Sequence, residues 1–250
     1  MNVVCQSCQS LVDADKNTAC PVCGFALGAA PAASAPIVRP AARPKVLPEI
    51  DLAITIDRTG SSLQFADGIR GSLPLMFDPI KARAPKLRVW LQSHGDEDEG
   101  QMPVLLTDAG TPEQAADDAK KIIFDGGGDP PEHHASAIEN LFHTVSWTAN
   151  PKSSRGAIVA FLTADTKPSR SGKTPKEIGE AIRAKNLLLF LVCEPTPSLH
   201  EMCQAAQGLM FTISKTPSMD DMSKIAAAMA KSIMLTVSTG GTVPMAVPVA

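Results

Sequence analysis

The stretch EIDLAITIDRTGS, residues 49–61, decides how this sequence folds. Most of its first nine residues are aliphatic or β-branched, which is typical of a strand buried on both faces. Its last five residues, Asp57 to Ser61, are polar and include a glycine, so the strand is expected to end in a turn. The sequence therefore predicts a buried strand over residues 49–57 that runs into a loop rich in side-chain oxygen atoms.

Apolar strand patterns alternate with helical patterns along the rest of the chain. Further strands are predicted at residues 86–94, 102–107, 157–163, 187–193 and 209–213, and helices at 62–83, 111–124, 132–149, 174–185, 198–207 and 218–237. This alternation predicts an α/β fold, in which a doubly wound, mainly parallel six-stranded sheet carries helices on both faces. The second and third strands have no helix between them, so we expect them to form a hairpin that adds an antiparallel edge.

Composition divides the chain into four parts. Residues 1–28 hold four of the six cysteines, and residues 29–48 consist mainly of alanine and proline. The second part has no periodic apolar face and is interpreted as an extended linker. Residues 49–238 form the main domain, and residues 239–250 are predicted to be a flexible tail.

The cysteines of the first part follow a metal-binding pattern. Cys5 and Cys8 form one C-x-x-C pair and Cys20 and Cys23 form another, with eleven residues between the pairs. Two such pairs predict a tetrahedral Zn²⁺ site, and the pattern resembles a zinc ribbon. A segment this short cannot fold on burial alone, so zinc would supply its stability.

Oxygen-bearing side chains also follow two strands and precede one helix of the main domain. The first strand leads into Asp57, Thr59 and Ser61, which alternate and can therefore point the same way. Asp129 lies in the loop GGGDPPE, and Asp165 follows the strand at 157–163. Ligand sites of such sheets lie where the strands end at their carboxyl edge, and hard oxygen ligands suit Mg²⁺, Mn²⁺ or Ca²⁺.

These loops resemble the metal-ion-dependent adhesion site of von Willebrand factor A domains. That family's pattern is D-x-S/T-x-S after the first strand, a Thr or Asp in a second loop, and an Asp after the central strand. The resemblance covers residues 49–238, including the order of the elements. It implies that Asp57, Thr59 and Ser61 form the first motif, Asp129 the second and Asp165 the third.

The sequence departs from the family pattern at two positions. Ala164 separates Thr163 from Asp165, where the family usually has Thr directly followed by Asp. Asp129 stands where integrin-like members have Thr. Together with Asp57 and Asp165, Asp129 would more than neutralise one divalent cation, so the metal would be a weaker acceptor for a partner's carboxylate.

Other polar residues are given no metal role. His133 and His134 are adjacent, which does not suit two ligands on one helix face. The acidic run at residues 94–100 is interpreted as a solvated hairpin tip. Residues 171–174 (SGKT) lack the upstream glycine of a phosphate-binding loop.

The resemblance implies a non-enzymatic, metal-dependent module for protein–protein interaction, with the zinc ribbon as a second contact. Similar intracellular proteins are bacterial adaptors of stress and defence systems. One alternative is a hydrolase that uses the same metal, with Glu132 or His133 as base. Another is a zinc ribbon that binds nucleic acid, which its low Lys and Arg content disfavours.

Composition restricts these alternatives further. The net charge is −3, and the chain has no Tyr and only two Trp, so neither a basic surface nor base-stacking residues favour nucleic acid. The N-terminus does not resemble a signal peptide, and the longest apolar run is too short to cross a membrane. We therefore expect a cytoplasmic protein that does not bind membranes.

Overall fold

A computed structural model describes residues 2–4, 11–13, 15–19, 49–128, 130–148, 154–214 and 217–246. The chain divides into two compact units, residues 1–45 and residues 46–250. In the first unit, strands β1 (Asn2–Val4) and β2 (Leu11–Asp13) pair antiparallel. The four cysteines of the predicted zinc site and the predicted linker at 29–48 lie outside the described residues.

The second unit contains one mixed six-stranded sheet. Its strands are β3 (Glu49–Asp57), β4 (Lys86–His94), β5 (Val104–Gly110), β6 (Ser154–Phe161), β7 (Leu188–Cys193) and β8 (Leu209–Thr212). Their order is β5-β4-β3-β6-β7-β8, and β5 alone runs antiparallel to its neighbour. The predicted α/β class, the six strands and the antiparallel hairpin are thus confirmed.

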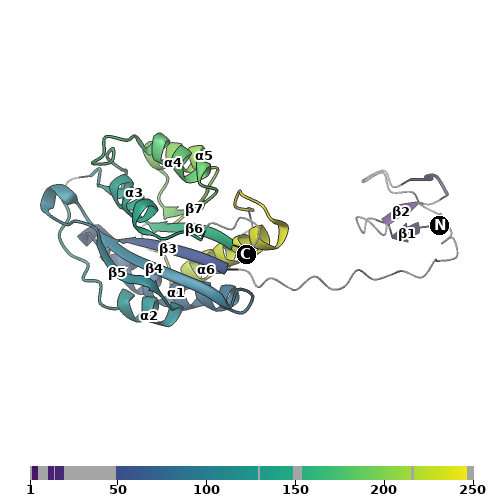
Figure 1. Ribbon diagram of the computed structural model, residues 1–250, viewed down its shortest axis with the longest axis horizontal. Helices are drawn as coiled ribbons and strands as arrows, with labels where there is room; N and C mark the ends of the chain where they lie inside the picture. Colours follow the sequence, from purple (N-terminus) through teal and green to yellow (C-terminus); the bar gives the residue numbers. More distant parts are fainter. Residues whose placement is uncertain are drawn as a thin grey trace. The chain divides into compact units, whose positions relative to one another are not determined.

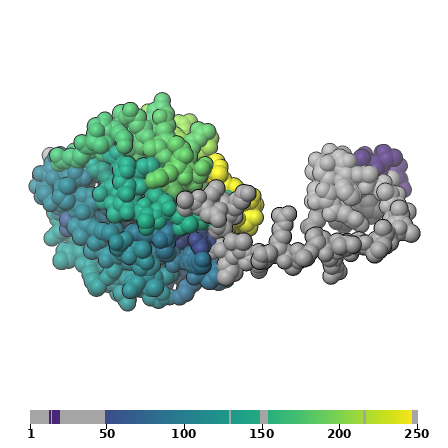
Figure 2. All heavy atoms as spheres, viewed as in Figure 1, coloured from purple at the N-terminus to yellow at the C-terminus, as the bar shows by residue number. Residues whose placement is uncertain are grey.

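Helices cover both faces of this sheet (Figure 1). They are α1 (Ala66–Lys81), α2 (Pro112–Ala119), α3 (His134–Thr144), α4 (Pro175–Ala184), α5 (Pro197–Ala206) and α6 (Met219–Thr239), with short 3-10 helices η1 (Gly60–Phe65) and η2 (Glu97–Glu99). The core against α1, α2 and α6 lies on one face, and the core against α3, α4 and α5 lies on the other. In the space-filling view the green residues, which include α4 and α5, form one side of the domain (Figure 2).

The central strand β3 explains why the sheet is buried on both sides. Ile50, Leu52, Ile54 and Ile56 alternate along it and all join the core beneath α1 and α6, while Ala53 joins the opposite core. All five side chains are fully buried. Each large aliphatic side chain buried in this way contributes about 1.5–3 kcal/mol relative to leaving it exposed. This burial fixes the strand whose end carries Asp57.

Two helices begin as the sequence predicts. Thr111 and Thr174 each accept a hydrogen bond from the backbone three residues later, and in both cases a proline follows at the first helical position. The side chains of Gln114 and Glu177 in turn accept a hydrogen bond from the backbone N–H of Thr111 and Thr174, which completes a capping box at each helix. These caps determine where α2 and α4 start.

Several predicted boundaries are wrong for identifiable reasons. Helix α2 ends at Ala119 rather than residue 124, because the next N–H groups bond three residues back, Lys121 to the carbonyl of Asp118 and Ile122 to that of Ala119. Helix α3 starts at His134 rather than residue 132, because the backbone of Glu132 pairs with the chain around Thr166. Strand β6 starts three residues earlier than predicted and ends at Phe161, two residues earlier.

The end of the described chain is tied to the domain. Helix α6 closes at Thr239 on Gly240, which has φ 71°. The carbonyl of Gly241 then accepts a 2.8 Å hydrogen bond from Arg155. The start of the predicted flexible tail is therefore held by a contact. Among the described helices, none combines the length and apolar character that a membrane crossing requires.

Candidate metal centre

The first predicted loop folds tightly around the carboxylate of Asp57. Its Oδ1 accepts hydrogen bonds from the backbone N–H and the hydroxyl of Thr59, at 2.9 and 2.8 Å. Thr59 Oγ1 lies 3.0 Å from the Oγ of Ser61. The structure therefore brings Asp57, Thr59 and Ser61 together, as their alternate spacing predicts.

Thr163 joins this group from the end of β6. Its hydroxyl donates to Oδ2 of Asp57 and lies 2.9 Å from the Oγ of Ser61 and 3.2 Å from that of Ser62. The sequence analysis predicted Asp165, and not Thr163, as the metal-site residue after this strand. The available signal was that Thr163 is the first polar residue after the central apolar strand.

The glycine-rich loop lies directly against the first loop. The backbone N–H of Gly60 donates to the carbonyl of Gly126 at 2.9 Å. Gly127 has φ 90°, and a Cβ atom there would lie 2.8 Å from the Cβ of Thr59. Only glycine permits both this conformation and this approach. The loop thereby leads the chain towards Glu132.

Glu132 is a second residue at this centre, besides Thr163, that the metal-site prediction missed. Glu132 is 4% exposed, and none of the described residues forms a hydrogen bond with its Oε2. Burial, together with the neighbouring carboxylates of Asp57 and Asp96, raises the pKa of Glu132 to about 7. The nearby Thr59 hydroxyl and Lys167 ammonium partly oppose this rise in the pKa. A buried carboxylate beside another one is costly unless a cation or proton compensates it.

Asp165 has a different set of contacts. Its Oδ1 accepts from the hydroxyl of Thr196 at 2.6 Å and from the backbone N–H of Thr166 at 2.9 Å, and Ser198 lies 3.3 Å from its Oδ2. These bonds orient the Asp165 carboxylate at the edge of the third loop. Asp129, the predicted second-loop ligand, lies outside the described residues.

The acidic hairpin tip is solvated only in part: Asp98, Glu99 and Gly100 are exposed, as predicted, but the residues before them are not. Asp96 and Glu97 are buried, because the loop after β6 covers them. The ammonium of Lys167 lies 2.7 Å from Asp98 and 3.4 Å from Asp96, and Arg170 contacts Glu97 at 3.0 Å and Asp98 at 2.9 Å. The two loops are therefore joined by ion pairs, although the exposed ones contribute little each.

His133 belongs to the same set of contacts. Its Nδ1 lies 2.7 Å from Oδ1 of Asp96, and with Asp98 these residues could surround a cation. The Lys167 ammonium already lies against both carboxylates. We therefore assign this cluster to the joining of the loops and not to a metal.

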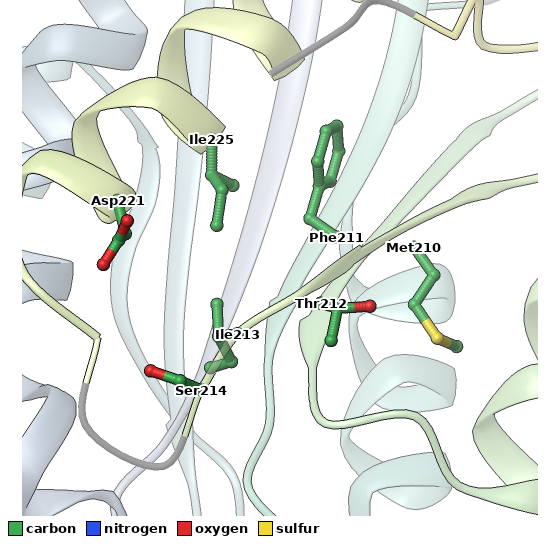
Figure 3. Close-up of a pocket in the computed structure, with 7 residues that line it drawn as sticks. All are labelled: Met210, Phe211, Thr212, Ile213, Ser214, Asp221 and Ile225. Carbon is green, nitrogen blue, oxygen red and sulfur yellow. The ribbon is translucent and has the colours of Figure 1, made fainter. Parts of the chain in front are cut away.

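Two hollows lie next to the centre. One of about 190 Å³ is bounded by Ser61, Thr163, Phe65 and Ile213, together with Gln64, Leu162, Glu194 and Ser214. A second of about 340 Å³ shares Ile213 and Ser214 and extends between β8 and α6 (Figure 3). Asp221 on its wall accepts hydrogen bonds from Ser218, the N-cap of α6, so it belongs to the capping box of that helix. The smaller hollow is the one that reaches the metal-site residues.

The residues present fit a hard divalent cation. Asp57 and Glu132 supply carboxylate oxygens, and Thr59, Ser61 and Thr163 supply hydroxyl oxygens. The unpartnered, buried Oε2 of Glu132 is an acceptor that such a cation would satisfy. Oxygen-only ligands of this kind favour Mg²⁺, Mn²⁺ or Ca²⁺ over softer metals.

Comparisons with known proteins bear on the fold. No protein-family model matches the sequence, and no curated protein matches it. Among solved structures, the chain is similar to the SpRpn10 VWA domain, with a TM-score of 0.55 and 13% identity over 79% of this chain and 100% of that one. It is also similar to proximal thread matrix protein 1 from the mussel byssus, with a TM-score of 0.54 and 14% identity over 74% of this chain and 46% of that one. At these identities the likeness concerns architecture alone, and the α/β domain of this chain has a von Willebrand factor A-like fold.

Proposed function

We propose that this protein is a metal-dependent protein-interaction module and not an enzyme. The observation that carries the proposal is the convergence of Asp57, Thr59, Ser61 and Thr163 beside the buried, unpartnered carboxylate oxygen of Glu132. Domains of this fold commonly bind other proteins. A divalent cation at this edge of the sheet would offer a partner an exposed coordination position, because Ser61 is exposed and Thr163 is only half-buried.

The centre's own residues have distinct roles in this proposal. Asp57 and Glu132 supply charge to the cation, while the hydroxyls of Thr59, Ser61 and Thr163 supply neutral oxygens. The predicted ligands Asp129 and Asp165 would add further negative charge. Mg²⁺ is the favoured cation, with Mn²⁺ or Ca²⁺ as alternatives, and its role is to attract an oxygen atom of the partner.

This charge balance restricts how a partner binds. Asp57 and Glu132 alone offset the charge of one divalent cation, so a partner carboxylate meets little net positive charge. Affinity should then depend on the surrounding surface as well. The hollow beside Ser61 and Thr163 has apolar walls at Phe65 and Ile213, which suit an aliphatic side chain of the partner.

The hydrolase alternative finds less support among the same residues. A metal-dependent hydrolase needs a base placed to activate water. His133, one of the two candidates, is engaged with Asp96 at 2.7 Å, and Glu132 is accounted for as a ligand. We therefore favour binding over catalysis.

The zinc ribbon adds a second contact to this proposal. It rests on the spacing of Cys5, Cys8, Cys20 and Cys23 alone. A protein partner is favoured over nucleic acid there, because Lys16 is the only basic residue before the linker. A module with two such contacts would suit a cytoplasmic adaptor, for example in a bacterial stress or defence system.

The proposal is tested by titrating the purified full chain with Mg²⁺ and Mn²⁺ in a calorimeter, and then by measuring partner capture with and without chelator. Asp57→Asn is the test variant, and Asp117→Asn, on the exposed face of α2, is its control. We expect cation binding and cation-dependent capture in the wild type and control only. Equal capture by Asp57→Asn, or cation-dependent turnover of phosphoester substrates that this variant loses, would refute the binding proposal.

A further inference from the structure

A chain of hydrogen bonds runs through the interior of the domain towards the metal centre. Gln92 Nε2 lies 3.0 Å from the carbonyl of Ala137 and 3.1 Å from Thr55 Oγ1. Thr55 Oγ1 lies 2.8 Å from Nδ1 of His94, and Nε2 of His94 lies 2.9 Å from Nδ1 of His134. All of these side chains are fully buried. The chain therefore links β3 and β4 to the first turn of α3.

The direction of these hydrogen bonds follows from Gln92. Its Nε2 must be the amide nitrogen, because a carbonyl can only accept. Thr55 Oγ1 thus accepts from Gln92 and donates its own hydrogen to Nδ1 of His94, because the reverse bond would leave the buried Thr55 hydroxyl hydrogen without an acceptor among the described residues. His94 then carries its hydrogen on Nε2 and donates it to Nδ1 of His134, so His134 carries its hydrogen on Nε2.

Both imidazole rings are neutral. Burial, with His134 next in importance, lowers the pKa of His94 to about 3. Burial also lowers the pKa of His134, against the opposing influence of the Asp57 and Asp165 carboxylates. The hydrogen bonds by themselves give each ring a single hydrogen, and the lowered pKa values agree with this.

The Nε2–H of His134 has no acceptor among the described residues, although the side chain is completely buried. Leaving such a donor unpaired is unfavourable, because it gives up its hydrogen bond to water on folding and gains none in return. The adjacent His133 and His134 are both buried and have different partners, His133 on Asp96 and His134 on His94, so they do not act as two ligands on one helix face.

The position of His134 indicates where its acceptor lies. His94 stands beside Asp57 in the register of β3 and β4, which places the histidine pair next to the first loop. On the other side, Ala135 N donates to Thr166 Oγ1 at 2.8 Å, and Glu132 N donates to the carbonyl of Asp165 at 2.9 Å. His134 therefore lies between the strand ends that carry Asp57 and Asp165.

We propose that Nε2–H of His134 donates a hydrogen bond to an oxygen atom in the coordination sphere of the cation, which makes His134 a positioning residue of the metal centre. The inference rests on the proposed metal-binding function. Through His94, Thr55 and Gln92, the centre would be held by a rigid network that ends on the backbone of α3. Such outer hydrogen bonds orient the groups around a metal and raise its affinity.

Two substitutions of His134 distinguish the roles of its two ring nitrogen atoms. The amide of Asn reaches about as far as Nδ1, so His134→Asn keeps an acceptor for His94 but loses the Nε2 donor. The amide of Gln reaches about as far as Nε2, so His134→Gln keeps that donor. We expect Mn²⁺ affinity to fall roughly tenfold or more in His134→Asn and to stay near the wild-type value in His134→Gln. Thermal unfolding of both variants without metal shows whether each remains folded.

A second measurement does not depend on substitution of the histidine. In protein labelled with ¹⁵N-histidine, the Nε2–H resonance of His134 should move when Mg²⁺ is added to the wild type and should stay in place in Asp57→Asn. The role of His134 is refuted if both His134 variants bind Mn²⁺ as tightly as the wild type and the resonance does not move when Mg²⁺ is added. The proposed metal centre would be unaffected by that result, because the wild type would still bind Mn²⁺. Absence of Mn²⁺ binding by the wild type would refute the proposed function itself, and this inference with it.

Discussion

The hydroxyl of Thr163 donates a hydrogen bond to Oδ2 of Asp57, a residue 106 positions earlier in the sequence. Oδ1 of the same carboxylate accepts two hydrogen bonds from Thr59. Both oxygens of Asp57 are thus oriented by the protein, one by the loop after β3 and the other by the loop after β6. A carboxylate held in this way needs little reorganisation when a cation binds, which favours affinity.

Thr163→Val should weaken cation binding without unfolding the domain. Valine keeps the shape of threonine but removes the hydroxyl that contacts Asp57 and Ser61. We expect Mg²⁺ affinity to fall roughly tenfold and the free energy of unfolding to fall by about 1 kcal/mol. Calorimetric titration and chemical denaturation measure the two effects. Thr212→Val, at an exposed position of β8, is the control. Unchanged Mg²⁺ affinity in Thr163→Val would show that this hydroxyl does not serve the centre.

Asp57→Asn should abolish cation binding and leave the fold intact. The amide oxygen can still accept from Thr59, and the Thr163 hydroxyl can turn to accept from the new amide nitrogen. Removing one charge also relieves repulsion with Glu132, whose pKa is raised by burial and by Asp57. In metal-free buffer the variant should therefore unfold at or above the wild-type temperature, while Mg²⁺ should no longer raise it. A variant that unfolds well below the wild type would assign Asp57 a structural role instead.

The sequence predicts the elements of this domain better than it predicts which loop residues meet. The apolar runs of β3, β6 and β7 are buried on both faces, so their composition identifies them without knowledge of their neighbours. Asp57, Thr59 and Ser61 are adjacent in the sequence, and their alternation indicates that they converge. These features depend on local pattern alone.

Glu132 and Thr163 depend instead on contacts between distant parts of the chain. Glu132 falls within a predicted helix, but its backbone N–H and carbonyl bond to Asp165 and Lys167, which hold it in an extended conformation. Thr163 lies inside the predicted strand, yet β6 ends two residues before it. Pairing between the second and third loops decides the position of Glu132, and local periodicity carries no information about that pairing.

Glu139 should stabilise the domain at neutral pH and cease to do so in strong acid. Burial raises its pKa, but hydrogen bonds from Lys173, Ser169 and Ser171 outweigh burial and lower the pKa to about 2. Because the folded-state value lies below the unfolded one, the stabilisation is complete above the unfolded pKa, near 4.5, and is lost as the pH falls through about 2.

Glu139→Gln tests this prediction. At pH 7 the variant should be less stable than the wild type by about 1–3 kcal/mol, the usual cost of losing hydrogen bonds to a charged group. The difference should shrink as the pH falls from 4.5 towards 2. Urea denaturation across that range measures it, with Glu180, which is exposed on α4, replaced by Gln as the control. A difference that is constant with pH would mean that packing and not charge stabilises Glu139.

The two C-x-x-C pairs should bind one Zn²⁺ per chain, and replacing Cys5 and Cys8 by Ser should abolish its binding. The two cysteines outside these pairs, Cys193 and Cys203, are poor zinc ligands because zinc binds thiolates. Burial raises the pKa of Cys193 to about 12 and that of Cys203 to about 11. Elemental analysis of protein purified without chelator should therefore give about one zinc for the wild type and for a Cys203→Ala control, and none for the double variant. Because residues 46–250 form a separate unit, thermal unfolding of the α/β domain should be the same in the wild type and the double variant. Wild-type protein that contains no zinc while all its cysteines are reduced would contradict the zinc-ribbon prediction.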